Sequence, residues 1–91
     1  MSIQGEVVPG NIVTSISGRD KNRYYVVMSS CGKFVEICDG DLHKVDKLKK
    51  KNVKHIKNTG EDDEMLTKMI VSGEKVSDSE IRKALKVFNK D

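Results

Sequence analysis

The residues in this sequence best suited to chemistry are basic side chains spaced to meet phosphate groups. Arg19, Lys21 and Arg23 alternate along the chain, so in an extended loop they would project from one side. A second segment holds six lysines within eleven residues: Lys47, Lys49, Lys50, Lys51, Lys54 and Lys57. Residues 1–58 hold eleven basic and six acidic side chains, whereas residues 59–91 hold six and eight. The first part is a candidate polyanion binder, although such runs are as often only solvated surface.

The other reactive residues form no recognisable catalytic or metal-binding pattern. Four side chains could supply metal ligands, but their spacings match no zinc site: Cys31, Cys38, His43 and His55. A cysteine nucleophile would need a base and an orienting group, and the sequence identifies no such arrangement. The acidic residues 61–64 are more typical of a helix N-terminus than of a catalytic pair. We therefore expect no enzyme activity, no metal and no cofactor.

The composition limits the kind of fold that can position these side chains. The chain has 91 residues, of which 36% are hydrophobic and 34% charged, and this favours one small, highly solvated domain. No apolar run approaches the roughly 18 residues of a membrane-spanning helix, and the N-terminus lacks the features of a secretory signal. With two cysteines outside any paired spacing, we expect free thiols and a cytoplasmic protein without membrane contact.

Alternating apolar residues predict short strands over the first half of the chain. The first strand follows Pro9 and Gly10 and places three residues on one face: Ile12, Thr14 and Ile16. Gly18 and Asn22 both tolerate positive φ, so the polar loop between them is expected to turn tightly at both ends.

The next two apolar runs predict a hairpin with Cys31 and Gly32 at the centre of its turn. This register pairs Val26 with Ile37 and places five residues in the core: Tyr24, Val26, Met28, Val35 and Ile37. The outer face is then unusually apolar, because it carries Tyr25, Val27, Phe34, Glu36 and Cys38.

Asp39 and Gly40 predict a second hairpin that leads into a fourth short strand over residues 42–45. In the lysine-rich segment that follows, Val53 and Ile56 are the residues that could anchor a fifth strand. Four or five antiparallel strands within about fifty residues predict a small closed barrel, because closure removes the exposed edges of the sheet.

After Gly60 the pattern becomes typical of two short helices, at about 61–72 and 78–89. Four residues mark one face of the first helix, which Gly73 would end: Met65, Leu66, Met69 and Ile70. Ser77 and Glu80 have the spacing of a capping box, and apolar residues recur after them at Ile81, Leu85 and Phe88. We expect a helical hairpin, or two helices folded against the barrel.

The segment from Pro9 to Val27 resembles a KOW motif, which is a strand, a glycine with nearby basic residues, and a second apolar strand. The matching residues are Pro9-Gly10-Asn11-Ile12-Val13, Ser17-Gly18-Arg19-Asp20-Lys21-Asn22-Arg23 and Tyr25-Val26-Val27. The resemblance continues through residues 35–40 and 49–56 and covers roughly residues 8–57. The sequence looks like the small bacterial KOW-domain RNA-binding proteins, which are similar to the large-subunit ribosomal proteins of archaea and eukaryotes that carry this motif.

This resemblance implies a mainly β protein, with an SH3-like barrel (KOW domain) over residues 6–58 and a helical extension over residues 59–91. It implies a non-enzymatic protein that binds structured RNA, such as ribosomal RNA or the ribosome. By position, the RNA-binding residues would be Gly18, Arg19, Lys21, Arg23, Lys44, Lys49, Lys50, Lys51, Lys54 and His55. The interpretation requires that these residues converge into one patch when the sheet closes.

A protein-interaction module is the alternative, because SH3-like barrels also bind polypeptides and KOW segments occur in transcription factors. Its contact surface would be either the C-terminal helices or the apolar outer face of Tyr25, Val27 and Phe34. An exposed Tyr24 or Tyr25 would instead favour RNA, because its ring could stack on a base.

Overall fold

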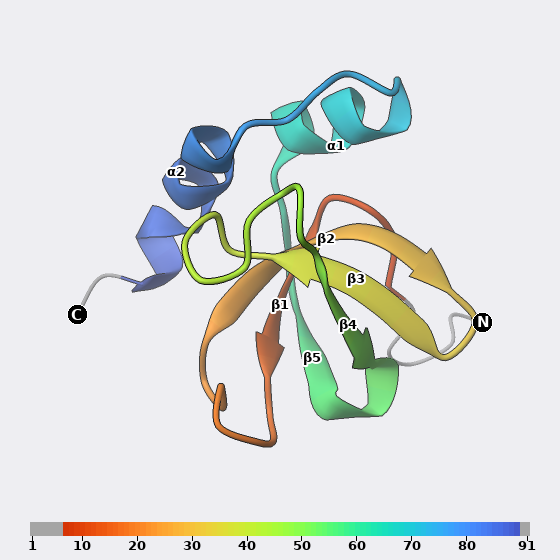
Figure 1. Cartoon of the computed structure of the whole chain (residues 1–91), viewed down its shortest axis with the longest axis vertical. Helices are drawn as coiled ribbons and strands as arrows, with labels where there is room; N and C mark the ends of the chain where they lie inside the picture. Colours follow the sequence, from red (N-terminus) through yellow and green to blue (C-terminus); the bar gives the residue numbers. More distant parts are fainter. Residues whose placement is uncertain (1–6, 90–91) are drawn as a thin grey trace.

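The computed structural model describes residues 7–89, which form a five-stranded antiparallel sheet and two helices (Figure 1). The strands are β1 (Asn11–Ser15), β2 (Tyr24–Cys31), β3 (Phe34–Cys38), β4 (Lys49–Asn52) and β5 (Ile56–Asp62). A single 3₁₀ turn, η1 (Val53–His55), joins β4 to β5, and the helices α1 (Glu64–Val71) and α2 (Asp78–Asn89) follow. The fold is mainly β, as the sequence predicts.

The sheet curls strongly because its two edge strands are consecutive in the chain. The strand order β4-β3-β2-β1-β5 puts β4 and β5 at opposite edges, yet only η1 separates them. Four Cα steps span at most roughly 14 Å, so the two edges must approach each other. Figure 1 shows them converging at η1, at the lower end of the sheet. Within residues 7–89, however, β4 and β5 are not hydrogen-bonded neighbours, so the sheet stays open.

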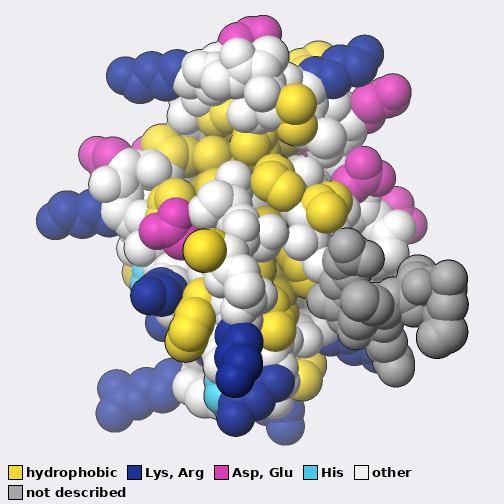
Figure 2. Space-filling view, turned by 90° about the vertical axis from the view of Figure 1, so that its right-hand side faces the viewer, with side chains coloured by type: hydrophobic (Ala, Val, Ile, Leu, Met, Phe, Trp, Pro, Cys, Tyr) yellow, Lys and Arg dark blue, Asp and Glu magenta, His cyan; other side chains and the backbone are white. Residues whose placement is uncertain are grey.

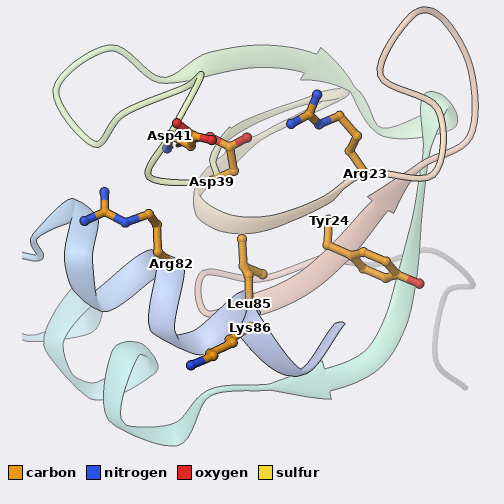
Figure 3. Close-up of a pocket in the computed structure, with 7 residues that line it drawn as sticks. All are labelled: Arg23, Tyr24, Asp39, Asp41, Arg82, Leu85 and Lys86. Carbon is orange, nitrogen blue, oxygen red and sulfur yellow. Dashed lines mark hydrogen bonds between the residues drawn. The ribbon is translucent and has the colours of Figure 1, made fainter. Parts of the chain in front are cut away.

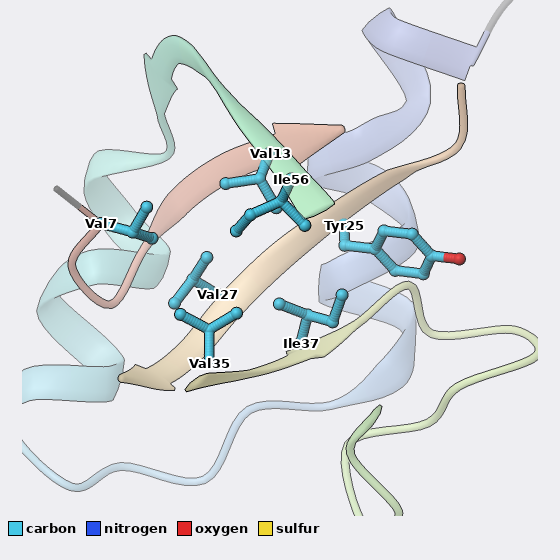
Figure 4. Packing of buried hydrophobic residues seen from close by; sticks show 7 residues of the cluster. All are labelled: Val7, Val13, Tyr25, Val27, Val35, Ile37 and Ile56. Atoms are coloured by element: carbon cyan, nitrogen blue, oxygen red, sulfur yellow. The ribbon is translucent and has the colours of Figure 1, made fainter. Parts of the chain in front are cut away.

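Both faces of the sheet are packed. The concave face encloses one apolar cluster (Figure 4), made of Val7, Val13, Tyr25, Val27, Val35, Ile37 and Ile56. The other face packs against the helices through a second cluster, made of Ile12, Val26, Cys38, Leu66, Val76, Ile81 and Leu85. β2 contributes to both clusters, as β1 and β3 also do, and it is the middle strand of the sheet.

The hairpin of β2 and β3 has a different register from the predicted one. Its turn is centred on residues 32–33, one position later than expected, and an irregularity follows in β2. Val26 therefore lies opposite Cys38 rather than Ile37. A one-residue shift exchanges the two faces of a strand. As a result, three residues predicted to lie beside Val35 instead face the helices: Tyr24, Val26 and Met28.

The same shift removes the apolar outer face that the sequence predicts. Tyr25 and Val27 are completely buried inside the curled sheet, and Cys38 is buried against the helices. Of the predicted face, Phe34 and Glu36 are exposed. The surface expected of a polypeptide-binding module on this sheet is therefore not present.

The segment predicted as a fourth strand, residues 42–45, is part of a loop. The Oδ1 atom of Asp39 accepts hydrogen bonds from the backbone N–H groups of Asp41 (3.0 Å) and His43 (2.8 Å). The backbone N–H groups of Asp39 and Gly40 both donate to the carbonyl of His43 (2.9 and 3.0 Å). These local bonds use the groups that a strand would need for its ladder, so the strand forms later, at β4.

Helix α1 begins at Glu64 rather than near residue 61, because β5 continues to Asp62. Asp63 caps the helix, and its side chain accepts a hydrogen bond from the backbone N–H of Leu66 (3.0 Å). The boundary expected between sheet and extension thus falls inside β5. Leu66 is buried as predicted, whereas Met65 is 68% exposed and does not belong to the core.

Helix α2 has the predicted bounds and the predicted cap. The backbone N–H of Ser77 donates to Glu80 Oε1 (3.0 Å), and the backbone N–H of Glu80 donates to Ser77 Oγ (3.2 Å). Ile81 and Leu85 are buried in the cluster that contains Val26 of the sheet. The helical extension is therefore packed onto the sheet and shares its core.

Candidate nucleic-acid interface

The loop between β1 and β2 turns back on itself. Gly18 (φ 84°) and Asn22 (φ 73°) take positive φ, as the sequence predicts. The backbone N–H of Lys21 donates to the carbonyl of Gly18 (3.3 Å), which closes the turn. Arg19, Lys21 and Arg23 are all exposed. The prediction of an extended loop with these three side chains on one side is wrong, because the backbone folds into a compact turn.

A buried ion pair connects this loop to β4. The Nζ atom of Lys51 lies 2.9 Å from Oδ1 of Asp20, and the two side chains are 12% and 14% exposed. Lys51 also donates to the hydroxyl of Ser15 (3.1 Å) and to the carbonyl of Ser17 (3.4 Å). The Tyr25 hydroxyl donates to Oδ2 of Asp20 (3.1 Å). The network ties edge strand β4 to β1, β2 and the loop, across the gap between the sheet edges.

The ionisation of this network follows from its contacts. Burial raises the pKa of the Asp20 carboxyl, but the hydrogen bonds from Lys51, Ser15 and Tyr25 and the charge of Lys51 lower it by more, so that it falls from 3.8 to about 2. Burial, the hydrogen bond to Asp20 and nearby negative charge raise the pKa of Tyr25 well above its ordinary value. At neutral pH the Asp20 carboxyl is therefore ionised, and the tyrosine beside it is neutral.

The 3₁₀ turn η1 lies against the same loop. The backbone N–H of Ile16 donates to the carbonyl of His55 (2.9 Å), and Nδ1 of His55 is hydrogen-bonded to the hydroxyl of Ser17 (2.9 Å). Asn52 caps the turn by accepting from the backbone N–H of Lys54 (3.0 Å), whose side chain is exposed. Two segments nearly forty residues apart in the chain thus form one surface.

We define the basic end of the molecule as the exposed cations on this surface: Arg19, Lys21, Lys54 and Lys57. Lys57 belongs to it because β5 begins directly after η1. Figure 2 shows Lys, Arg and His side chains gathered at the lower end of the molecule, where Figure 1 has the β1–β2 loop and η1, while acidic side chains lie higher. The predicted residues Gly18 and His55 lie in the backbone that supports this end.

Two lysines near this end were not among the predicted site residues. Lys57 was expected to meet phosphate as part of the lysine-rich segment, but it was not among the residues assigned by position from the KOW resemblance. Lys33 is exposed in the turn between β2 and β3, and its carbonyl accepts a hydrogen bond from the backbone N–H of Val53 in η1 (2.8 Å). A lysine beside a hairpin glycine was the only sequence signal for it.

The three lysines of β4 are divided between its two faces. Lys51 lies opposite Val35 and points into the curled sheet, where its ion pair keeps it from outside ligands, and Lys49 is half-buried on the same face. Lys50 lies on the other face, and its Nζ atom is 4.7 Å from the centre of the Phe34 ring. The three side chains therefore do not form one contact surface.

Lys44 and Arg23 lie toward α2. Lys44 is exposed in the β3–β4 loop, where the next residue, Val45, donates its backbone N–H to the side chain of Asp78 at the start of α2 (2.8 Å). Arg23 is the last residue of the β1–β2 loop and lines a cleft beside α2. The predicted residues therefore converge in part: Arg19, Lys21 and Lys54 come together, while Lys44 belongs to a different side.

No protein-family model matches this sequence, and no curated protein matches it. Among the residues that the structure describes, no three His, Cys, Asp or Glu side chains are grouped so that they could hold a metal ion. Neither α1 nor α2 is long and apolar enough to cross a membrane.

Proposed function

We propose that this protein is a cytoplasmic, non-enzymatic RNA-binding protein that docks on structured RNA, such as ribosomal RNA, through its basic end. The observation that carries the proposal is the meeting of the β1–β2 loop with η1, which brings Arg19, Lys21 and Lys54 onto one surface. Phosphate groups supply most of the affinity in such complexes, and clustered cations are the side chains that meet them.

The fold supports the same assignment. A curled sheet whose edges meet at a short 3₁₀ turn fits a small SH3-like barrel, and the glycine-containing basic loop is the part of the sequence that resembles a KOW motif. The loop is also held in place, because the buried pair of Lys51 and Asp20 anchors its central part to β4. A preorganised loop loses less conformational entropy when it binds.

Recognition at the basic end is expected to depend on RNA shape rather than base sequence. Tyr25 is completely buried and Tyr24 packs against Phe88, with 5.2 Å between ring centroids. Neither ring supplies a stacking platform beside Arg19 and Lys21. Contacts to the phosphate backbone of a folded RNA are the interactions that remain for this surface.

The test compares two double variants from which the same charge has been removed. Arg19→Ala/Lys21→Ala removes two cations of the basic end, and Lys68→Ala/Lys75→Ala removes two exposed cations of the helical side. Binding to a fluorescently labelled ribosomal RNA fragment is measured by anisotropy over a series of salt concentrations. Each lost phosphate contact lowers the log–log salt slope by roughly 0.7–0.9, so the first variant is expected to lose roughly 1.4–1.8 and the second close to zero.

Equal losses in the two variants would mean that the RNA senses only net charge, and the proposed interface would be wrong. RNA affinity and salt slope unchanged in Arg19→Ala/Lys21→Ala would exclude the loop. Circular dichroism of both variants establishes that the sheet is intact, because all four residues are exposed and their side chains support no buried contact.

A further inference from the structure

A polar cleft lies between α2, the β3–β4 loop and the start of β2 (Figure 3). Its volume is about 680 Å³, within the range of about 300–1,000 Å³ that is usual for sites of small ligands. The cleft is separate from the basic end, but Arg23, which lines it, is the last residue of the β1–β2 loop. A ligand that extends from this loop past Arg23 would therefore reach the opening of the cleft.

The walls of the cleft are held by specific contacts. The guanidinium of Arg82 on α2 donates to the carbonyl of Gly40 in the loop (2.6 Å). Gly40 has positive φ (75°), and a Cβ atom there would lie 2.5 Å from the backbone oxygen of Asp78. Asp39 has its Oδ1 atom engaged by two backbone N–H groups. The loop is thus fixed against α2, and the cleft is preformed.

Charges of both signs line the cleft without pairing to each other. In Figure 3, Asp41 lies on the loop wall and Lys86 on the helix wall, with Arg23 at a third side. In the part of the chain that the structure describes, the ion pair within 4.0 Å is Lys51 with Asp20, so neither Asp41 nor Lys86 is held by one. Both side chains are exposed and available to a ligand.

The rest of the lining is apolar. Leu85 is 1% exposed and forms part of the wall, and Tyr24 is half-buried beside it. The cleft therefore combines a carboxylate, flanking cations and an apolar surface. A nucleotide offers the complementary groups: base N–H donors, a phosphate and a planar apolar ring.

We propose that this cleft binds one unpaired guanine nucleotide of the RNA. The carboxylate of Asp41 would accept the adjacent N1–H and N2–H groups of guanine with its two oxygens, whereas uracil offers one N–H on that edge. Lys86 and Arg23 would contact the flanking phosphates, and the half-buried Tyr24 the ring. The inference rests on the proposed function, because the guanine belongs to the RNA that docks on the basic end. Arg23 connects that end to the cleft.

The test follows the backbone amide signals of the labelled protein by NMR during titration with 5′-GMP, 5′-UMP and the single-stranded RNA UUGUU. We expect GMP to shift the amides of residues 39–41 and 82–86 and to bind at least fivefold more tightly than UMP, since a good base contact gives about that discrimination or more. UUGUU is expected to bind more tightly than GMP and also to shift the β1–β2 loop.

Matched variants separate the base from the phosphate. Asp41→Asn should abolish the preference for GMP over UMP, whereas Asp46→Asn, an exposed carboxylate in the same loop, should leave it intact. Lys86→Gln should weaken GMP and UMP equally, whereas Lys83→Gln, exposed on the same helix, should weaken neither.

Three outcomes would overturn the inference. Equal affinity for GMP and UMP, or a preference that survives Asp41→Asn, would show that the cleft does not read guanine. Shifts that appear with an N-acetyl-Lys-Asp amide but not with either nucleotide would show that it binds peptide. Guanine preference with no gain for UUGUU would exclude RNA as the source and identify a free nucleotide as the ligand. Failure of the RNA docking proposal alone leaves the GMP result unchanged, so the two failures are distinguishable.

Discussion

Replacing Lys51 by methionine should destabilise the protein by about 2–3 kcal/mol. The variant keeps the apolar stem but leaves the Asp20 carboxylate buried without its cation. Removing one partner of a fully buried ion pair costs about 3–5 kcal/mol. The net fall of the Asp20 pKa from 3.8 to about 2, to which Ser15 and Tyr25 contribute as well as Lys51, corresponds to about 2 kcal/mol at 1.36 kcal/mol per unit and sets the scale of the effect. The two side chains remain 12% and 14% exposed and so admit some water. The cost of Lys51→Met should therefore lie nearer to about 2 kcal/mol than to the full cost for a completely buried pair.

The assay is urea unfolding at neutral pH, with Lys50→Met as the matched control on the same strand. Lys50 is exposed, and its contact with the Phe34 ring is worth about 0.5–1 kcal/mol. A double-mutant cycle with Asp20→Asn then isolates the pair, because in the double variant no charge is left unpaired. We expect Lys51→Met to cost much less when Asp20 is already replaced.

The ion pair would not stabilise the fold if Lys51→Met cost no more than Lys50→Met, or if the effects of the substitutions at Lys51 and Asp20 were simply additive. Either result would mean that the loop and β4 hold their positions without the pair.

Three further predictions concern pH, loop packing and the thiols. The Asp20 pKa is lowered in the folded protein. The stability that the Asp20 carboxylate contributes is therefore present above pH 4 and should be lost as the pH falls toward 2. Acid unfolding curves should show the stability difference between the protein and Asp20→Asn shrinking over that range. Gly40→Ala should lower the melting temperature more than Gly60→Ala, because both glycines have positive φ but only Gly40 faces a backbone atom at 2.5 Å; equal losses would mean that the loop is not fixed against α2. Cys31 is exposed, whereas burial raises the pKa of Cys38 to about 12, so a thiol reagent should label Cys31 in the native protein and Cys38 only in urea; fast labelling of Cys38 without denaturant would contradict its burial.

Local signals in the sequence were sufficient where short-range chemistry decides the structure. The capping box at Ser77 and Glu80 and the spacing of Ile81 and Leu85 gave the bounds of α2, because the cap and the buried stripe both depend on residues within the helix. The turn at Gly18 was equally clear, since glycine has no Cβ and adopts positive φ without steric cost.

The assignment of faces could not be predicted because residues 24–28 are all apolar. A strand buried on one face shows alternation, but β2 is buried on both faces, so its pattern contains no period of two from which to read the register. The irregularity in β2 and the position of the turn then decided which side Tyr25 and Val26 face. Neither feature has a sequence signal of its own here.

The candidate site was predictable in its position and not in its detail. Charge spacing identified the β1–β2 loop and the lysine-rich segment, but it could not separate Lys50, which faces outward, from Lys51, which is buried against Asp20. That distinction depends on strand alternation and on a carboxylate thirty-one residues away. The basic end is therefore smaller than the lysine count suggests.

The lysines of β4 also affect whether another strand can pair with this edge of the sheet. Among residues 7–89, β4 pairs with β3 on one side, and no strand pairs with it on the other side, where a strand of another molecule could add. If a second copy docked there in antiparallel fashion about Lys50, ammonium groups would face ammonium groups, and their repulsion would oppose pairing. The composition of this short strand thus opposes edge-to-edge pairing of two copies of the protein.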